Sequence, residues 1–148
     1  MKIYLDACCL NRPFDDHAQD RIRLESEAVL SILSQSKIKK WLLLNSEIID
    51  IEISKIPDSD KKQRVGILSS LLKPLILIDE NVERRAIVLE DLGFESYDAL
   101  HIACAEKGKA NILLTTDDKF LNKGLQYKDI LTVRVENPVK WLMEVIGK

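Results

Sequence analysis

Short apolar runs alternate with longer amphipathic stretches along the chain, the pattern of a sheet whose strands are covered on both faces. The runs expected to be strands are Lys2–Leu5, Trp41–Leu44, Leu75–Ile78, Asn111–Leu114 and Ile130–Val133. Because strands alternate with helical stretches, the order predicts an α/β fold. We expect three layers, with a doubly wound, mainly parallel sheet of about five strands and helices on both faces.

The stretches between these runs carry apolar residues at helical spacing. Ser46 has the chemistry of an N-cap, Gly93 and Gly108 are stop signals, and Pro138 stands at a helix-start position. The helices expected are Asp20–Ser36, Ser46–Ile56, Asp60–Leu72, Asn81–Leu92, Ser96–Lys107 and Pro138–Ile146.

Composition indicates an ordinary globular protein. The 148 residues are 46% apolar and 31% charged, which favours one domain over 1–148 and argues against disorder. A net charge of −2 gives no global basic field, and clusters such as Lys37, Lys39 and Lys40 are interpreted as solvated helix ends. With no apolar signal region and no run of membrane-spanning length, we expect a cytoplasmic protein without a membrane partner.

The cysteines do not indicate a metal site. Cys8, Cys9 and Cys104 are an odd number without a CxxC spacing, and the two histidines lie far apart, so zinc is not favoured. Cys8 and Cys9 are interpreted as small buried hydrophobes.

Acids follow two of the predicted strands. Asp6 ends the first strand, and the stretch ILLTTDD brings Thr115, Thr116, Asp117 and Asp118 to the end of a later one. Because the carboxyl ends of parallel strands share one edge of a sheet, these side chains are expected at the same edge.

One acid interrupts an apolar helical stripe. In NSEIIDIEISKI, Glu52 shares a stripe with Ile49 and Ile53, whereas Glu47 and Asp50 fall on the opposite side and are expected to face solvent. An inward carboxylate is costly unless it is paired, protonated or bound to a cation. The plainer alternative is that Glu52 reaches past its isoleucines to water or a lysine.

A further acid stands in the first turn of a helix. Asp98 precedes small residues, which allow that helix to lie close to the sheet with its N-terminus near the same edge. The plainer alternative is that Asp98 complements the helix dipole. His101, one turn on, is expected to be a half-buried hydrogen-bonding residue rather than a catalyst.

Asp6, Glu52, Asp98 and Asp117 are thus predicted to point at one place. Clustered carboxylates repel one another, and a divalent cation removes that penalty. Hard oxygen ligands without clustered Cys or His select Mg²⁺ or Mn²⁺. Such a site suits phosphodiester hydrolysis.

At these residues the chain resembles the PIN-domain family, the metal-dependent ribonucleases that include VapC-type toxins. The resemblance covers nearly the whole chain and rests on IYLDACCL, NSEIIDIEI, SYDALHIACA and ILLTTDDKF. It implies that Asp6, Glu52, Asp98 and Asp117 bind Mg²⁺ or Mn²⁺ and position a hydrolytic water. Thr115, Thr116 and Asp118 are expected to support them.

The chain departs from the family pattern directly after Asp6. Many relatives have a hydroxyl or amide residue there, whereas this chain has Ala7 and Cys8. Asn11 and Arg12, on a loop expected from Asn11 to Asp20 that contacts substrate, are candidates to substitute.

The resemblance implies an endoribonuclease, the toxin of a toxin–antitoxin pair, with RNA as substrate, a small antitoxin as partner and a homodimeric state. The alternatives are a non-toxin RNA-processing nuclease and a non-catalytic binding module of the same fold. A phosphoacceptor receiver domain fits less well because only Asp79 could be its nucleophile, and an aspartate-nucleophile phosphatase would need an acid at Cys8.

Overall fold

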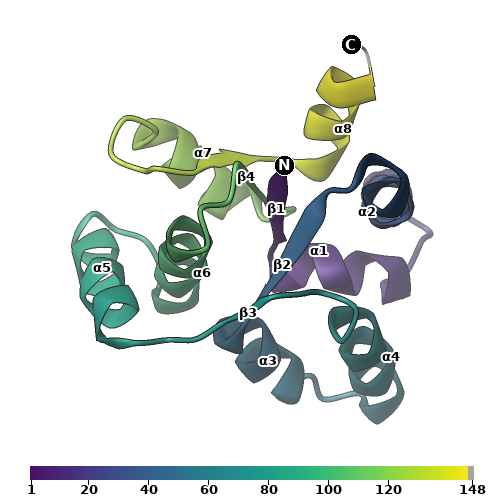
Figure 1. Ribbon diagram of the computed structural model, residues 1–148. Helices are drawn as coiled ribbons and strands as arrows, with labels where there is room; N and C mark the ends of the chain where they lie inside the picture. Colours follow the sequence, from purple (N-terminus) through teal and green to yellow (C-terminus); the bar gives the residue numbers. More distant parts are fainter. Residues whose placement is uncertain (147–148) are drawn as a thin grey trace.

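The computed structural model describes residues 1–146, and five parallel strands form the sheet at its centre (Figure 1). The strands lie in the order β3-β2-β1-β4-β5. Their bounds are β1 (Lys2–Leu5), β2 (Leu42–Ser46), β3 (Leu75–Ile76), β4 (Ile112–Leu114) and β5 (Arg134–Glu136). The predicted parallel sheet is confirmed.

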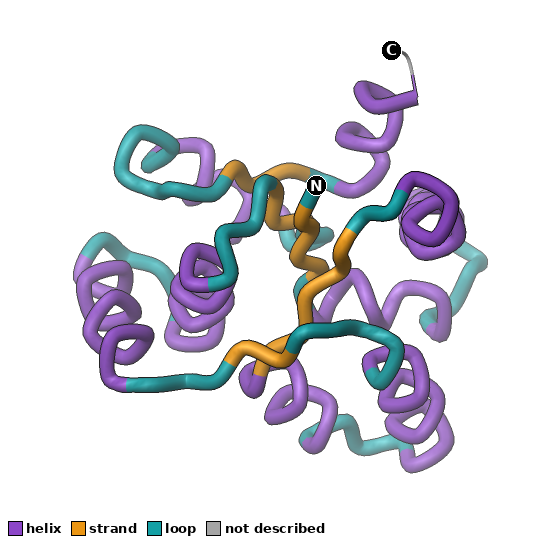
Figure 2. Tube along the Cα trace, viewed as in Figure 1, coloured by secondary structure: helices purple, strands orange, loops and turns teal. Residues whose placement is uncertain are grey.

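Helices cover both faces of the sheet, which confirms the predicted three layers. In Figures 1 and 2, α5 and α6 lie on one side of the strands, and α1 and α2 lie on the other. The bounds are α1 (Ala7–Asn11), the 3-10 helix η1 (Arg12–Phe14), α2 (Asp20–Lys39), α3 (Glu47–Ser54), α4 (Ser59–Ser69), α5 (Glu80–Asp91), α6 (Ser96–Lys107), α7 (Asp118–Gln126) and α8 (Pro138–Ile146).

The central strand β1 is buried on both faces, as its unbroken apolar run predicts. Ile3 pairs with Leu43 of β2 and with Ile112 of β4, and the side chains of Ile3, Tyr4 and Leu5 have no exposed surface. Within residues 1–146, no helix combines the length and apolarity needed to cross a membrane.

The predicted strand Ile130–Val133 is wrong. Tyr127 to Ile130 form the turns that end α7, and the strand starts four residues later than expected, at Arg134. Pairing decides the position, because Val135 and Glu136 lie opposite residues of β4 and are buried there, whereas Ile130 is exposed.

Three helical segments, α1, η1 and α7, were not expected. The segment predicted as a loop from Asn11 to Asp20 begins with the end of α1 and then η1, and only the remainder is irregular. Helix α7 was not predicted at all. By contrast, α6 and α8 have the predicted bounds, and the other helices differ from prediction by up to three residues at an end.

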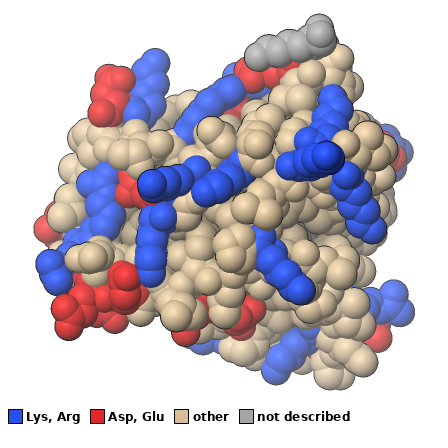
Figure 3. Space-filling model, in the orientation of Figure 1, with Lys and Arg blue, Asp and Glu red and all other residues tan. Residues whose placement is uncertain are grey.

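The amino end of the sheet, where the chain enters the strands, is rich in lysine. We call this surface the lysine face; its residues are Lys37, Lys39, Lys40, Lys73 and Lys109, all exposed. Lys37, Lys39 and Lys40 lie at the C-terminal end of α2, before β2. Lys73 lies just before β3, and Lys109 just before β4. Figure 3 shows Lys and Arg side chains spread over the middle of the face turned toward the viewer.

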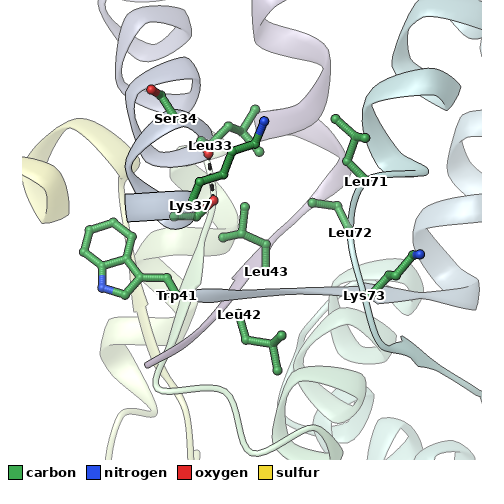
Figure 4. A pocket seen from close by; sticks show the side chains of 10 residues that line it. Leu33, Ser34, Lys37, Trp41, Leu42, Leu43, Leu71, Leu72 and Lys73 are labelled. Carbon is green, nitrogen blue, oxygen red and sulfur yellow. Dashed lines mark hydrogen bonds between the residues drawn. The ribbon is translucent and has the colours of Figure 1, made fainter. Parts of the chain in front are cut away.

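An apolar groove of about 430 Å³ lies beside the lysine face (Figure 4). Leu33, Trp41, Leu43, Leu71 and Leu72 supply its apolar walls. No Asp or Glu is among its lining residues, so this apolar groove is separate from the predicted acids.

Candidate functional site

The structure brings the four predicted acids to the carboxyl end of the sheet. Asp6 directly follows β1 and Asp117 is the third residue after β4, while Glu52 lies in α3 and Asp98 in the first turn of α6. All four, named here the acid cluster, raise the pKa of the half-buried Cys8 thiol through their negative charge. They therefore surround one short segment of chain.

Asp6 is held by its own helix and by the neighbouring strand. Its Oδ1 accepts a hydrogen bond from the Cys9 backbone N–H (3.0 Å), so it is the N-cap of α1. Its backbone N–H donates to the Leu114 carbonyl of β4 (3.1 Å). The side chain is only 2% exposed, and this burial raises its pKa.

Asp117 has an equivalent position on the adjacent strand. Its Oδ1 accepts from the backbone N–H groups of Lys119 (2.9 Å) and Phe120 (3.3 Å), which makes it the N-cap of α7. Its own N–H donates to Thr115 Oγ1 (3.1 Å), and the Thr115 side chain also hydrogen-bonds Asp6. Thr115 thus contacts the Asp6 side chain and the Asp117 backbone, as a supporting residue would.

Asp98 is also strongly affected by its surroundings. Partial burial, followed by the charges of Asp117 and Asp6, raises its pKa to about 7, with His101 opposing the shift. The buried Ala99 and neighbouring small residues hold α6 against the sheet, as expected from the sequence.

Glu52 is half-buried, and its Oε1 hydrogen-bonds His101 Nε2. The stripe argument therefore placed Glu52 correctly on the inward side. Glu47 was expected to face solvent, and this was wrong. It is half-buried and accepts a hydrogen bond from the Ile78 backbone N–H (2.7 Å), which ties α3 to the chain after β3.

The other predicted supporting residues serve different neighbours. Asp118 is paired with Arg21 through both carboxylate oxygens (2.7 Å each), and Arg21 also donates to the Thr116 carbonyl (3.0 Å). Arg12 donates to Asp15 and to the buried Glu25 (3.0 Å each). These contacts stabilise the segments next to the acid cluster and do not involve its four carboxylates.

Asn11 provides an oxygen without a partner beside Asp117. Within residues 1–146, Asn11 Oδ1 is buried and has no hydrogen-bond partner. Asn11 lines a hollow of about 310 Å³ together with Cys8, Thr116 and Asp117. The sequence identified Asn11 as a candidate, and the structure places it next to the acid cluster.

The donor chemistry of this site fits a hard divalent cation. Asp6 and Asp117 each use Oδ1 for a helix cap, which leaves Oδ2 available, and Asn11 Oδ1 is a further oxygen donor. As the side chains stand, no three His, Cys, Asp or Glu groups of residues 1–146 meet closely enough to hold an ion. A bound divalent cation would offset the mutual repulsion of these carboxylates.

Sequence reasoning underestimated His101. It was expected to be half-buried, yet it is 2% exposed, and its Nδ1 hydrogen-bonds the Tyr4 hydroxyl (2.7 Å). The signal available was a tyrosine hydroxyl in the middle of an apolar strand, since such a group needs a partner when it is buried.

Comparison with protein-family profiles matches residues 3–124 to the PIN domain. No curated protein matches the chain. Among solved structures, VapBC2 from Rickettsia felis, bound to a DNA fragment from its promoter, has a TM-score of 0.63 at 20% identity and covers 93% of this chain and 98% of that chain. FitAcB from Neisseria gonorrhoeae has a TM-score of 0.58 at 18% identity, covering 92% of this chain and 97% of that one.

Proposed function

The chain belongs to the PIN domain family, and on this premise we propose that it is a Mg²⁺- or Mn²⁺-dependent endoribonuclease, the toxin of a toxin–antitoxin pair. The observation that carries the proposal is the gathering of Asp6, Glu52, Asp98 and Asp117 at the carboxyl end of the sheet.

In this proposal the acid cluster holds the cation. Asp6, Asp98 and Asp117 are the ligands, with Glu52 acting directly or through water. A bound divalent cation would lower the pKa of the attacking water and would stabilise the charge that develops on the phosphate. Thr115 contacts both the Asp6 side chain and the Asp117 backbone, and each carboxylate also accepts the backbone N–H bonds of a helix cap. The products carry 5′-phosphate and 3′-hydroxyl ends.

The direct test compares cleavage of a labelled RNA panel by the wild type, Asp6→Asn and Asp98→Asn, with Mg²⁺, Mn²⁺ or a chelator. Loss of an acid is expected to reduce cleavage by about a hundredfold or more, the scale of removing a group that stabilises transition-state charge. Asp50→Asn, an exposed acid on the same helix as Glu52, is the matched control and should cleave normally. Undiminished, metal-dependent cleavage by both variants would falsify the assignment.

The toxin role draws on the two similar structures, which are a VapBC2 complex and FitAcB. We propose that a small antitoxin, encoded in a neighbouring reading frame, binds this chain and occupies the rim of the acid cluster. Expression of the chain alone should arrest growth, and Asp6→Asn should relieve the arrest. Normal growth with active wild-type protein would favour an RNA-processing nuclease instead.

A binding module without catalysis is the second candidate. It is favoured by the observation that no three ligating side chains of residues 1–146 meet closely. Calorimetric titration with Mn²⁺ separates the two functions, because a binding module would not take up the ion at millimolar concentration. Uptake that disappears in Asp6→Asn would support the nuclease.

We also propose that the chain forms a homodimer through the edge of the sheet at β3. This edge strand is short and presents Leu75 (48% exposed), followed by Leu77 (53%), next to Leu71 at the end of α4 (68%). An exposed apolar edge strand favours association with another chain.

A further inference from the structure

A chain of hydrogen bonds runs through the buried interior and ends on Glu52. Ser46 Oγ lies 2.7 Å from the Tyr4 hydroxyl, and that hydroxyl lies 2.7 Å from His101 Nδ1. On the other side of the ring, His101 Nε2 hydrogen-bonds Glu52 Oε1. Ser46 and Tyr4 have no exposed surface and His101 is 2% exposed, so water does not compete for these contacts.

The partners on each side of the imidazole determine which nitrogen carries the proton. An ionised carboxylate only accepts hydrogen bonds, so Nε2 must donate to Glu52. A neutral ring then has an acceptor at Nδ1, and the Tyr4 hydroxyl can donate to it. A tyrosine hydroxyl has an ordinary pKa of about 10, so at neutral pH it has a proton to donate. Ser46 is then free to donate to the Tyr4 oxygen.

The network also joins the two helices that carry acids. His101 is one turn after Asp98 in α6, while Glu52 belongs to α3. The edge of the Tyr4 ring lies against the imidazole, with ring centroids 5.6 Å apart and planes at 71°. A residue of the central strand therefore fixes the ring that connects Asp98's helix to Glu52.

We propose that His101 is a positioning residue for Glu52, and that Tyr4 fixes its imidazole with the proton on Nε2 so that Glu52 is held at the acid cluster. This proposal rests on the proposed function of the acid cluster. The hydrogen bond occupies one carboxylate oxygen of Glu52 and leaves the other available. Groups that orient a ligand in this way affect metal affinity and activity by about 10- to 100-fold in other metal sites.

The decisive variant is Tyr4→Phe, which keeps the ring and removes only the hydroxyl. Tyr127→Phe is the matched control, because Tyr127 packs against Phe94 and is not a member of the network that reaches Glu52. Nitrogen-15 NMR of the histidine rings reports the protonated nitrogen directly. The chain has two histidines, and the exposed His17 is the internal reference, assigned through His17→Gln.

In the wild type we expect His101 to carry its proton on Nε2 with Nδ1 accepting from Tyr4, and in Tyr4→Phe we expect the Nδ1 signal to shift because its hydrogen-bond donor is gone. Affinity for Mn²⁺ by calorimetry should fall about tenfold in Tyr4→Phe and be unchanged in Tyr127→Phe. For RNA cleavage, kcat should fall while KM stays the same. His101→Gln, which retains a donor, should recover part of the Mn²⁺ affinity that His101→Leu loses.

A proton on His101 Nδ1 in the wild type overturns the proposal. So does a Mn²⁺ affinity that changes equally in Tyr4→Phe and Tyr127→Phe while the amide spectra show both variants folded. The ring measurement needs no catalysis, so it remains decisive if the wild type cleaves no RNA. Absence of RNA cleavage by the wild type would count against the ribonuclease assignment and would leave the proposal about His101 untouched.

Discussion

Asp6 and Asp117 are helix caps as well as members of the acid cluster. Each accepts backbone N–H bonds through Oδ1 at the start of a helix, α1 for Asp6 and α7 for Asp117. The N-terminus of a helix favours negative charge, which partly offsets the cost of placing carboxylates together. Substitutions at these positions therefore change both the local fold and the charge of the site.

Asparagine and alanine at position 117 should separate these two effects. Asn caps a helix about as well as Asp, whereas Ala does not. Asp117→Ala is thus expected to lose about 1 kcal/mol of unfolding free energy, and Asp117→Asn much less. Both should lose Mn²⁺ affinity. Urea denaturation measures the first quantity and calorimetry the second; equal destabilisation by Asn and Ala would contradict the capping role.

Asp98 should make the protein less stable as the pH rises toward neutrality. Its pKa in the folded protein is about 7, above the ordinary value for an Asp side chain, so ionising it opposes folding. The stability cost is absent below the unfolded-state pKa, grows as the pH rises, and is complete above about 7.

Asp98→Asn should therefore stabilise the protein at pH 8 and have little effect at acid pH. Allowing for solvent screening at this half-exposed site, we expect about 1–2 kcal/mol at pH 8 without divalent cations. Chemical denaturation at several pH values tests this, with the exposed Asp129→Asn as control. A variant that is less stable than the wild type at pH 8 would show that the Asp98 carboxylate is favourable.

At the residue scale, helical periodicity located Glu52 but misjudged Glu47 and His101. The pattern reports which side of a helix is apolar, and Glu52 interrupts that side. It carries no information about the Ile78 N–H that Glu47 meets, or about the Tyr4 hydroxyl that meets His101. Both partners are brought in by strands distant in sequence, so only the folded sheet reveals them.

At the element scale, prediction succeeded where a helix or strand has a strong local pattern. The run Lys2–Leu5 and the capped stretch Ser96–Lys107 were correct in full. Helix α7 was missed because its sequence is polar, and only Phe120 and Gly124 are buried in it. The last strand was misplaced because Ile130–Val133 is the more apolar run, while pairing with β4 selects Arg134–Glu136.

Gly124 allows α7 to approach β5 closely. A Cβ added there would lie 2.9 Å from Val135 Cβ, the branch point of a buried side chain that cannot simply rotate away. Gly124→Ala is therefore expected to destabilise the protein by about 1–3 kcal/mol, despite the better helix propensity of alanine.

Gly66→Ala is the matched control in the interior of α4. A Cβ at Gly66 meets nothing within 4 Å, so only helix propensity changes. This variant should gain about 0.5–1 kcal/mol of unfolding free energy. Thermal or urea denaturation of the two variants measures the sign of each change in unfolding free energy. A stabilising Gly124→Ala would refute the close contact between α7 and β5.

At the scale of the whole molecule, the proposed dimer predicts an effect of charge at the β3 edge. Leu77→Lys places a cation in an apolar contact and should weaken self-association by about tenfold or more. Light scattering across a range of concentrations measures the mass. Ile38→Lys is the control, since Ile38 is 79% exposed on α2 and is not a residue of the β3 edge. Equal masses for Leu77→Lys and the wild type would exclude this edge as the interface.

The separation of the acid cluster from the lysine face makes the protein an electric dipole along its strands. The two ends are about 15 Å apart, the length of a strand of four or five residues. A polyanion, such as the proposed RNA substrate, would be drawn to the lysine end and would be repelled by the acid cluster unless a cation were bound there. The Debye length is about 8 Å at physiological ionic strength, shorter than this separation, and about 30 Å at 0.01 M salt. At low ionic strength an approaching nucleic-acid strand would therefore feel the charges of both ends together. At physiological ionic strength it would feel each end separately.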